Sequence, residues 1–369
     1  MKFLRLAFYV LVAQLVLSGC AGEAVEETSS SSSSEINFDA YLGRNASTRS
    51  EVTDNTHLKG TEGNSGFGVF ARYKHTDGTI SPLMLMNNER VTWNKDQNHW
   101  EYTNTRYWPS EGFVDFYAFA PYSDQPKLVS PPNKNEPNPT CIYFPSNVSP
   151  VDLVWANAKD QTKTNEPVKF TFKHALARLG FDITANQILE KNGAVIKVKE
   201  VKLYGADEIS GVFVMAGYLN LENGAWTLAD NDIRWFYTWT PDGKVDGNEN
   251  VNEKDGTVLK LSASQLDHEH GIITNDADSY IFIIPQVKYF PFYLQITYKV
   301  KQGDFEEEVT VRKNLLDVRN PPGDPNPSFS FEMGKAYVFH LKLSLDPINF
   351  YVTTTVVNWN EVIDETMPL

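Results

Sequence analysis

The sequence predicts an all-β protein with two β-sandwich domains in tandem. Aromatic residues make up 13% of the chain and valine and threonine are frequent, which favours strands over helices. Glycine and proline interrupt the chain often, as turns between short strands require. Apolar and polar residues alternate with period two over many segments, whereas the best helical candidates, 174–178 and 264–269, are short turns.

The first strand is predicted at 36–42, where alternate side chains form one apolar face. These side chains are Ile36, Phe38, Ala40 and Leu42. A strand at 67–73, a hairpin at 91–102 and a strand at 113–120 follow, and the nearly continuous apolar character of the last predicts burial on both faces. Later strands are expected at 168–172, 179–184, 194–204, 280–284, 293–300, 336–345 and 348–359.

A polar stretch at 162–167 precedes a fresh series of predicted strands. We therefore expect an N-terminal sandwich at 36–166 and a C-terminal sandwich at 167–369. The proline-rich loops at 126–139 and 320–327 are interpreted as connections between strands.

The N-terminus predicts a bacterial lipoprotein signal over residues 1–19. Lys2 and Arg5 precede an apolar run that ends at Leu17, and small residues lead from there to Cys20. Cleavage between Gly19 and Cys20 would leave Cys20 to carry lipid. The run is shorter than the roughly 20 residues that a membrane-spanning helix needs. The alternative is an ordinary signal peptide that contains a cysteine.

Residues 20–35 form a Ser/Glu-rich tether with little apolar surface, so we expect disorder. The acidic residues that follow Cys20 resemble export signals of surface-displayed lipoproteins in the Bacteroidetes. Position 21 is not Asp, which argues against retention at the inner membrane. The expected location of the precursor is the outer membrane.

Charge and cysteine content narrow the classes of partner. The formal net charge is −14 without basic clusters, which is unfavourable for binding nucleic acid or anionic membrane surfaces. After lipidation of Cys20 only Cys141 remains, so no intrachain disulfide is expected.

Signals for chemistry are weak, and we predict no enzyme activity, catalytic residue, metal or cofactor. Asp267–His270 lacks the His-Glu-x-x-His spacing of a zinc-binding helix. The segment 246–257 begins like a calcium loop, but Val251 replaces the glycine and Thr257 the final glutamate. There is no Gly-x-Ser-x-Gly elbow or phosphate-binding loop. The sequence leaves open the alternative that the fold brings two carboxylates to face each other in a cleft.

Four motifs occur in order along the chain. They are Trp108-Pro109 with Val114–Pro121, Phe172–Leu179, Ile284-Pro285-Gln286 with Leu294–Tyr298, and Gly334–Tyr337 leading to Leu341–Leu343, Ile348 and Trp359. Together they resemble the Mfa-like family of the Bacteroidetes fimbrillin superfamily, the type V pilus subunits. The resemblance implies two transthyretin-like sandwich domains, export as a lipoprotein and polymerisation into pili. The motif residues, His174 among them, are interpreted as parts of the fold and not as chemical groups.

The segment 43–50 is small, polar and suited to proteolysis. The resemblance implies activation by an arginine-specific, gingipain-type protease that cuts just past the first strand. Arg49 matches that position best, and Arg44 is the second choice. Cleavage would remove 36–49 together with the lipid and tether. The alternative is an ordinary polar loop.

The C-terminal extension at about 346–369 offers a replacement strand. Its alternating side chains are Ile348, Phe350, Val352, Thr354 and Val356. Insertion into the vacated groove of another subunit would be β-augmentation, and a repeated head-to-tail contact builds a filament. The alternative is that 348–359 is the last strand of its own domain.

We therefore expect a fimbrial shaft subunit that supports adhesion. Expected partners are other fimbrial subunits, the protease, the outer membrane before cleavage, and host or bacterial surface ligands. A tip or accessory subunit is the next alternative, followed by a glycan-binding surface lipoprotein that uses Trp93, Trp100 and Trp108 for stacking, and by a cell-surface hydrolase. A glycan binder would expose these tryptophans, whereas we expect them in the core.

Overall fold

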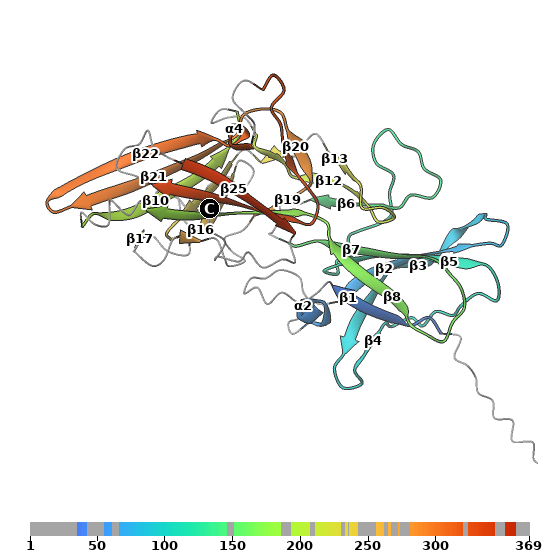
Figure 1. The fold of residues 1–369 in the computed structure, drawn as a ribbon. Helices are drawn as coiled ribbons and strands as arrows, with labels where there is room; N and C mark the ends of the chain where they lie inside the picture. Colours follow the sequence, from blue (N-terminus) through green and yellow to red (C-terminus); the bar gives the residue numbers. More distant parts are fainter. Residues whose placement is uncertain are drawn as a thin grey trace, which may run out of the picture. The chain divides into compact units, whose positions relative to one another are not determined.

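The structure is a computed structural model of the chain. It describes residues 35–42, 55–60, 66–145, 151–185, 193–206, 211–229, 233–234, 236–242, 256–261, 265–266, 272–273, 281–319, 324–343 and 351–358. All of these lie in one compact unit, Glu35–Leu369. The fold is almost entirely β, as the sequence predicts (Figure 1).

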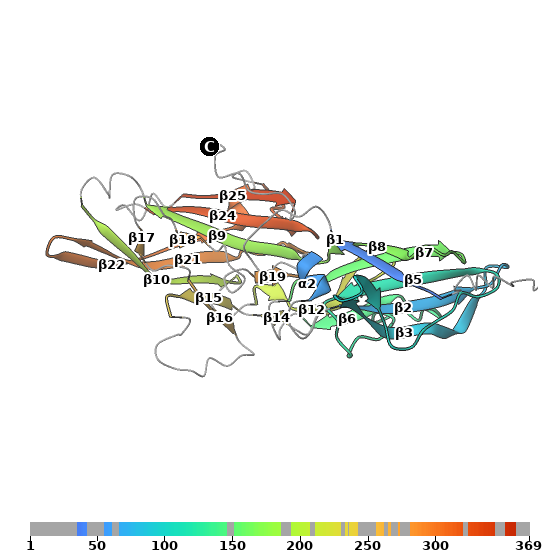
Figure 2. The same cartoon turned by 90° about the horizontal axis from the view of Figure 1, so that it is seen from below.

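The first sheet has seven strands in the order β1-β8-β7-β5-β2-β3-β4. Their bounds are β1 (Phe38–Leu42), β2 (Phe67–Lys74), β3 (Ile80–Asn94), β4 (His99–Glu101), β5 (Phe113–Ala120), β7 (Val154–Gln161) and β8 (Val168–His174). The two edge strands, β1 and β4, contact each other, so the sheet curls around its core (Figure 1). Figure 2 shows β1, β8, β7, β5, β2 and β3 from another side. That core is rich in aromatic residues, including Phe38, Phe67, Phe116 and Phe170.

Two sheets of six and five strands enclose the main core of the later part of the chain. One has the order β16-β15-β10-β21-β22 with β17 beside β10, and the other has the order β18-β9-β24-β25 with β19 beside β9. Their strands are β9 (Ala177–Ala185), β10 (Val195–Tyr204), β15 (Phe236–Thr240), β16 (Gly256–Lys260), β17 (Gln265–Leu266), β18 (Ile272–Ile273), β19 (Ile281–Ile283), β21 (Tyr293–Gln302), β22 (Phe305–Asn314), β24 (Lys335–Leu343) and β25 (Tyr351–Asn358).

Smaller elements complete the fold. They are β6 (Cys141–Pro145), β12 (Ala216–Asn220) and β13 (Trp226–Leu228) in one sheet, β11 (Phe213–Val214) with β14 (Ile233–Arg234), β20 (Gln286–Lys288) with β23 (Phe329–Phe331), and the helices α2 (Asn55–Lys59) and α4 (Leu316–Arg319). No helix among the described residues is long and apolar enough to cross a membrane.

The position of β8 differs from the predicted division of the chain. A boundary between residues 166 and 167 assigns β8 to the second sandwich, but β8 pairs with β1 and β7 in the first sheet. The polar stretch 162–167 is the hairpin connection between β7 and β8. Alternating burial along Val168–His174 fits a strand with one covered face in either sandwich, so the sequence pattern did not distinguish the two.

Candidate functional site

The candidate site is the groove that holds β1. The side chains of Ile36, Phe38, Ala40 and Leu42 are 0–8% exposed, while the residues between them face solvent. This confirms the predicted strand and its buried face. Because β1 is an edge strand, its packing combines full burial on one face with pairing on only one side.

Phe38 occupies the aromatic centre of the groove. Its ring stacks on Phe170 with centroids 5.6 Å apart, and lies 5.6 Å from Tyr102, 5.8 Å from Phe116 and 6.4 Å from Phe67. Aromatic contacts of this kind contribute about 0.5–1.5 kcal/mol each beyond their buried area. The position is therefore shaped for a large planar side chain.

Hydrogen bonds to the main chain hold β1 in register. It pairs in parallel with β8, with Phe38 opposite Val168 and Leu42 opposite Phe172. The N–H of Val168 donates to the carbonyl oxygen of Asn37 at 2.8 Å. Along 38–42 the other side of β1 pairs with no strand among the described residues.

The N-terminal end of this segment is held on a second side. The N–H of Ile36 donates to the carbonyl oxygen of Arg106 at 2.8 Å, and the Tyr102 hydroxyl donates to the carbonyl oxygen of Ile36 at 2.7 Å. Glu35 forms an isolated bridge with Tyr107. Burial raises the pKa of Tyr102, which keeps its hydroxyl protonated as a donor. We call residues 102–107 the strap.

Removal of the first strand would leave an apolar groove open to water. Each large side chain contributes roughly 1.5–3 kcal/mol when buried, so Ile36, Phe38 and Leu42 account for several kcal/mol together. The backbone groups of β8 that pair with β1 would also lose their partners. The empty groove therefore favours a replacement strand.

The chain is fixed on both sides of the predicted cleavage loop. Leu42 ends β1, and Leu58 in α2 is 2% exposed and packs into the same core. Lys59 of α2 places its ammonium 3.8 Å from the ring centroid of Trp93. Arg44 and Arg49 lie outside the described residues, as do Gly19 and Cys20.

The predicted donor segment forms β25 in the single chain. β25 pairs antiparallel with β24 and is the outer strand of its sheet. Val352 and Val356 are half-buried and pack against the core of that sandwich, and Thr354 is half-buried between them. Ile348 and Phe350 lie outside the described residues. Within one chain this segment therefore completes its own sheet, as the alternative interpretation expects.

The tryptophans proposed as a stacking platform belong largely to the core. Trp100 and Trp108 are 4% and 6% exposed, and Trp93 packs against Trp100 with ring centroids 5.3 Å apart. This confirms the expected core position. A glycan-binding face built from these three residues has no support in the fold.

The remaining candidate groups lie in surroundings that fit a structural role. His174 is buried, with its Nδ1 3.0 Å from Oδ1 of Asp152. Cys141 is buried, and burial raises the pKa of its thiol to about 11, so it is protonated at neutral pH. Within the described part of the chain no three side chains form a metal-binding group. Both segments weighed as metal sites fall in undescribed stretches, apart from Gly256 and Thr257.

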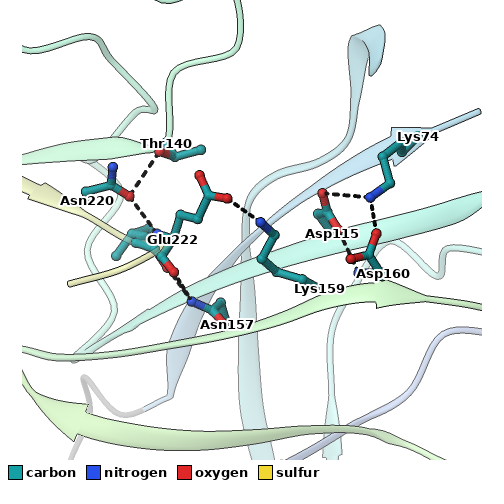
Figure 3. A network of polar contacts seen from close by, with 9 residues as sticks. Lys74, Asp115, Thr140, Asn157, Lys159, Asp160, Asn220 and Glu222 are labelled. Atoms are coloured by element: carbon teal, nitrogen blue, oxygen red, sulfur yellow. Dashed lines mark hydrogen bonds and ion pairs between the residues drawn. The ribbon is translucent and has the colours of Figure 1, made fainter. Parts of the chain in front are cut away.

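A polar network that the sequence did not predict links strand β7 to the β12–β13 turn (Figure 3). The side-chain amide of Asn157 donates to the carbonyl oxygens of Leu221 and Glu222 at 2.9 and 2.7 Å. Lys159 pairs with the Glu222 carboxylate. The partners lie more than sixty positions apart in sequence, so no local pattern signals the contact.

The same network extends along the first sheet. Lys74 of β2 pairs with Asp160, and the Asp160 N–H donates to Oδ1 of Asp115 at 2.7 Å. Asp115 is 6% exposed, and it is the one charged residue of the apolar strand β5. A buried carboxylate requires such partners. The network therefore explains why an apolar strand tolerates an aspartate.

Comparisons with known proteins found a matching family model and solved structures with a similar fold. A family model described as fimbrillin-like matches residues 48–359. A fimbrial protein from Bacteroides vulgatus shares the fold with 20% identity and a TM-score of 0.59, covering 88% of this chain and 99% of that one.

Two further solved structures are more distant. A putative cell adhesion protein from Bacteroides uniformis matches with 14% identity and a TM-score of 0.47, covering 88% of this chain and 98% of its own. The tip fimbrial protein Mfa3 from Porphyromonas gingivalis, with C-terminal truncation, matches with 11% identity and a TM-score of 0.35, covering 79% and 93%. A comparison with curated proteins gave no match.

Proposed function

Because the chain belongs to the fimbrillin-like family, we propose that it is a structural subunit of a cell-surface fimbria that polymerises by donor-strand exchange. The observation that carries this proposal is β1, an edge strand packed on one face, which is followed in the sequence by a small, polar segment with two arginines. A strand placed in this way can be removed by one cut, and its removal creates a binding site.

The first step in the proposal is anchoring. The lipoprotein signal at 1–19 directs export, and Cys20 receives the lipid that holds the precursor in the outer membrane. The tether at 20–35 then separates the membrane from the folded body. The final location is the extracellular fimbrium.

The second step is proteolysis after Arg49, with Arg44 as the second choice. Leu58 packs into the same core as β1, so the chain beyond the cut stays attached to the body. A cut in 43–54 therefore separates β1, tether and lipid from the body in one event.

The third step is replacement of β1 by the C-terminal segment of another subunit. In its own sheet β25 is an edge strand with half-buried Val352 and Val356. The groove buries the equivalent side chains of β1 to 8% exposure or less. Moving half-buried Val352 into such a position gains about 1 kcal/mol, which offsets part of the cost of leaving the β24 ladder, and the empty groove supplies the larger part of the driving force.

The resulting assembly is a fimbria that supports adhesion to host or bacterial surfaces, and we assign no enzymatic role to the chain. Each subunit carries one groove and one donor segment at different places, so the contact is head-to-tail and need not close. The surface of the assembled fimbria determines which ligand it binds.

The test compares Arg49→Ala, Arg44→Ala and the unmodified chain in cells that display the protein. We expect Arg49→Ala to remain a lipidated, surface-held monomer, whereas Arg44→Ala should assemble nearly as well as the unmodified chain. N-terminal sequencing of sheared protein and electron microscopy measure the two properties. Both variants could instead give filaments whose subunits have the same N-terminus as those of the unmodified chain. That result would refute proteolytic activation at these two arginines.

A further inference from the structure

The tripeptide that opens the first strand recurs in the donor segment. Ile36-Asn37-Phe38 and Ile348-Asn349-Phe350 are identical, and each is preceded by a turn-forming or acidic residue. We propose that the donor segment of a second copy enters the groove with the polarity of β1, placing Ile348 at the Ile36 position and Phe350 at the Phe38 position. This inference rests on the proposed function and specifies its register.

The side-chain positions of the groove select this register among those of the same polarity. Shifting the donor by two residues in one direction puts Val352 at the Phe38 position and leaves four aromatic rings around a cavity. Shifting it in the other direction puts Asp346 at the Ile36 position, where the side chain is 0% exposed. A buried carboxylate without a partner is strongly unfavourable.

The opposite polarity with Phe350 in the same position fits less well. If Phe350 keeps the Phe38 position and the donor runs the other way, Ile348 falls at the Ala40 position and Asp346 at the Leu42 position. Leu42 is 5% exposed in the apolar core, so this arrangement again buries a carboxylate. The parallel arrangement instead puts Val352 at Ala40, which is the most exposed of the four positions at 8%.

The main-chain contacts of β1 are available to the recurring tripeptide. Three bonds define its start: Ile36 N–H to Arg106, Tyr102 hydroxyl to the Ile36 carbonyl, and Val168 N–H to the Asn37 carbonyl. None of them uses the N–H at position 35. In the proposed register Pro347 takes that position, and the N–H that proline lacks is not needed there.

In this register the donor residues contribute unequally to the binding free energy. Phe350 enters the aromatic centre, whereas Val356 corresponds to position 44, beyond the end of β1 at Leu42. On the exposed face, Tyr351 takes the place of Asp39 beside Lys169. The pair formed by residues 169 and 351 is therefore a direct readout of the register.

The experiment uses the full chain carrying Lys169→Cys, cut by an arginine-specific protease in the presence of a synthetic peptide of residues 345–358. Three peptides carry a single cysteine at 349, 351 or 353, and disulfide formation is followed on a denaturing gel. A disulfide needs Cα atoms within about 7 Å, which a facing residue satisfies at about 5 Å and a residue two positions away, at about 8 Å, does not. The buried thiol of Cys141, with its pKa raised to about 11, does not compete, and Cys20→Ser in the same chain removes the other thiol.

We expect the peptide with Tyr351→Cys to crosslink and the other two to remain free. Crosslinking by Thr353→Cys or Asn349→Cys instead would overturn the register and leave donor-strand exchange standing. Crosslinking by none of the three, with β1 released, would overturn the proposed exchange itself and this register with it. As a second measurement, Phe350→Ala in the peptide should weaken binding on the order of a hundredfold and Val356→Ala by less than about threefold; equal losses would contradict the register.

Discussion

Replacing Phe38 by alanine tests whether β1 is held by its side chains in the precursor. The phenylalanine is 4% exposed and contacts four aromatic rings at 5.6–6.4 Å. Truncating a buried phenylalanine costs about 3–5 kcal/mol, made up of lost transfer free energy and the cavity left behind. Because β1 is an edge strand that can detach, we expect about 3 kcal/mol, at the lower end of this range.

The assay is urea denaturation of the uncut chain, with amide hydrogen exchange over 36–42 as a local measure. The exchange measurement separates detachment of β1 from unfolding of the whole body. Asp39→Asn in the same strand is the matched control, because its side chain faces solvent and keeps an oxygen that can accept from the Ala40 N–H. We expect that variant within about 0.5 kcal/mol of the unmodified chain.

The cut chain provides the decisive comparison. After proteolysis and release of β1, position 38 is no longer part of the body, so Phe38→Ala should leave its stability unchanged. An unchanged stability of the uncut variant would refute the argument that the Phe38 side chain holds β1. A loss of equal size in the cut and released chain would show that the strand does not leave.

Three further outcomes are expected. Cys20→Ala should abolish labelling by a palmitate analogue and leave unprocessed precursor, and normal labelling would contradict the lipoprotein signal. Burial lowers the pKa of Lys288 to about 8, so the unfolded chain binds more protons than the folded one between about pH 8 and 10.5. The free energy of unfolding should therefore rise over that window relative to Lys288→Met, and parallel pH profiles would count against this. Gly224 has φ +78°, and a Cβ added there would lie only 2.3 Å from Trp155. Gly224→Ala should therefore lower the free energy of unfolding by about 2–4 kcal/mol, as measured by thermal unfolding. Gly303 has open space around it, so Gly303→Ala should cost about 1 kcal/mol.

Alternating side chains made the first strand predictable, because a period of two fixes which residues share a face. Ile36 and Phe38 are buried together for this reason. The same rule could not assign β8 to a sheet, since an alternating strand fits any half-covered sheet, and hydrogen-bonding partners decide between them.

Other elements carry no usable pattern. β22 contains Glu306, Glu307 and Glu308 in succession, all exposed, so its sequence lacks an apolar face over that stretch. Pairing with β21 forms the strand, and an ion pair of 2.7 Å between Lys299 and Glu306 supports it. Similarly, the Asn157 contacts to the β12–β13 turn depend on distant backbone carbonyls that no local motif encodes.

The cleavage site remains a prediction from the sequence and the family resemblance. Arg44 and Arg49 lie outside the described residues, between Leu42 and Leu58, which are both packed in the first core. The donor segment is likewise described in the single chain only as β25, beside β24. Exchange between subunits depends on a second copy, which the pattern of one sequence cannot display.

The two ends of the first strand differ in their distance along the chain from the predicted cut, and this sets an order of events. The strap bonds Ile36 at the far end of the segment, whereas Leu42 is the last residue of the β8 ladder and the one nearest to Arg44 and Arg49. Fraying should therefore start at Leu42 and proceed toward Ile36. An incoming strand of the same polarity would first place Thr354 at the vacated Leu42 position. It would then pair with β8 residue by residue as β1 detaches toward Ile36. Replacement by such stepwise displacement never exposes the whole groove to water, so the barrier to exchange is lower than the barrier to complete loss of the strand.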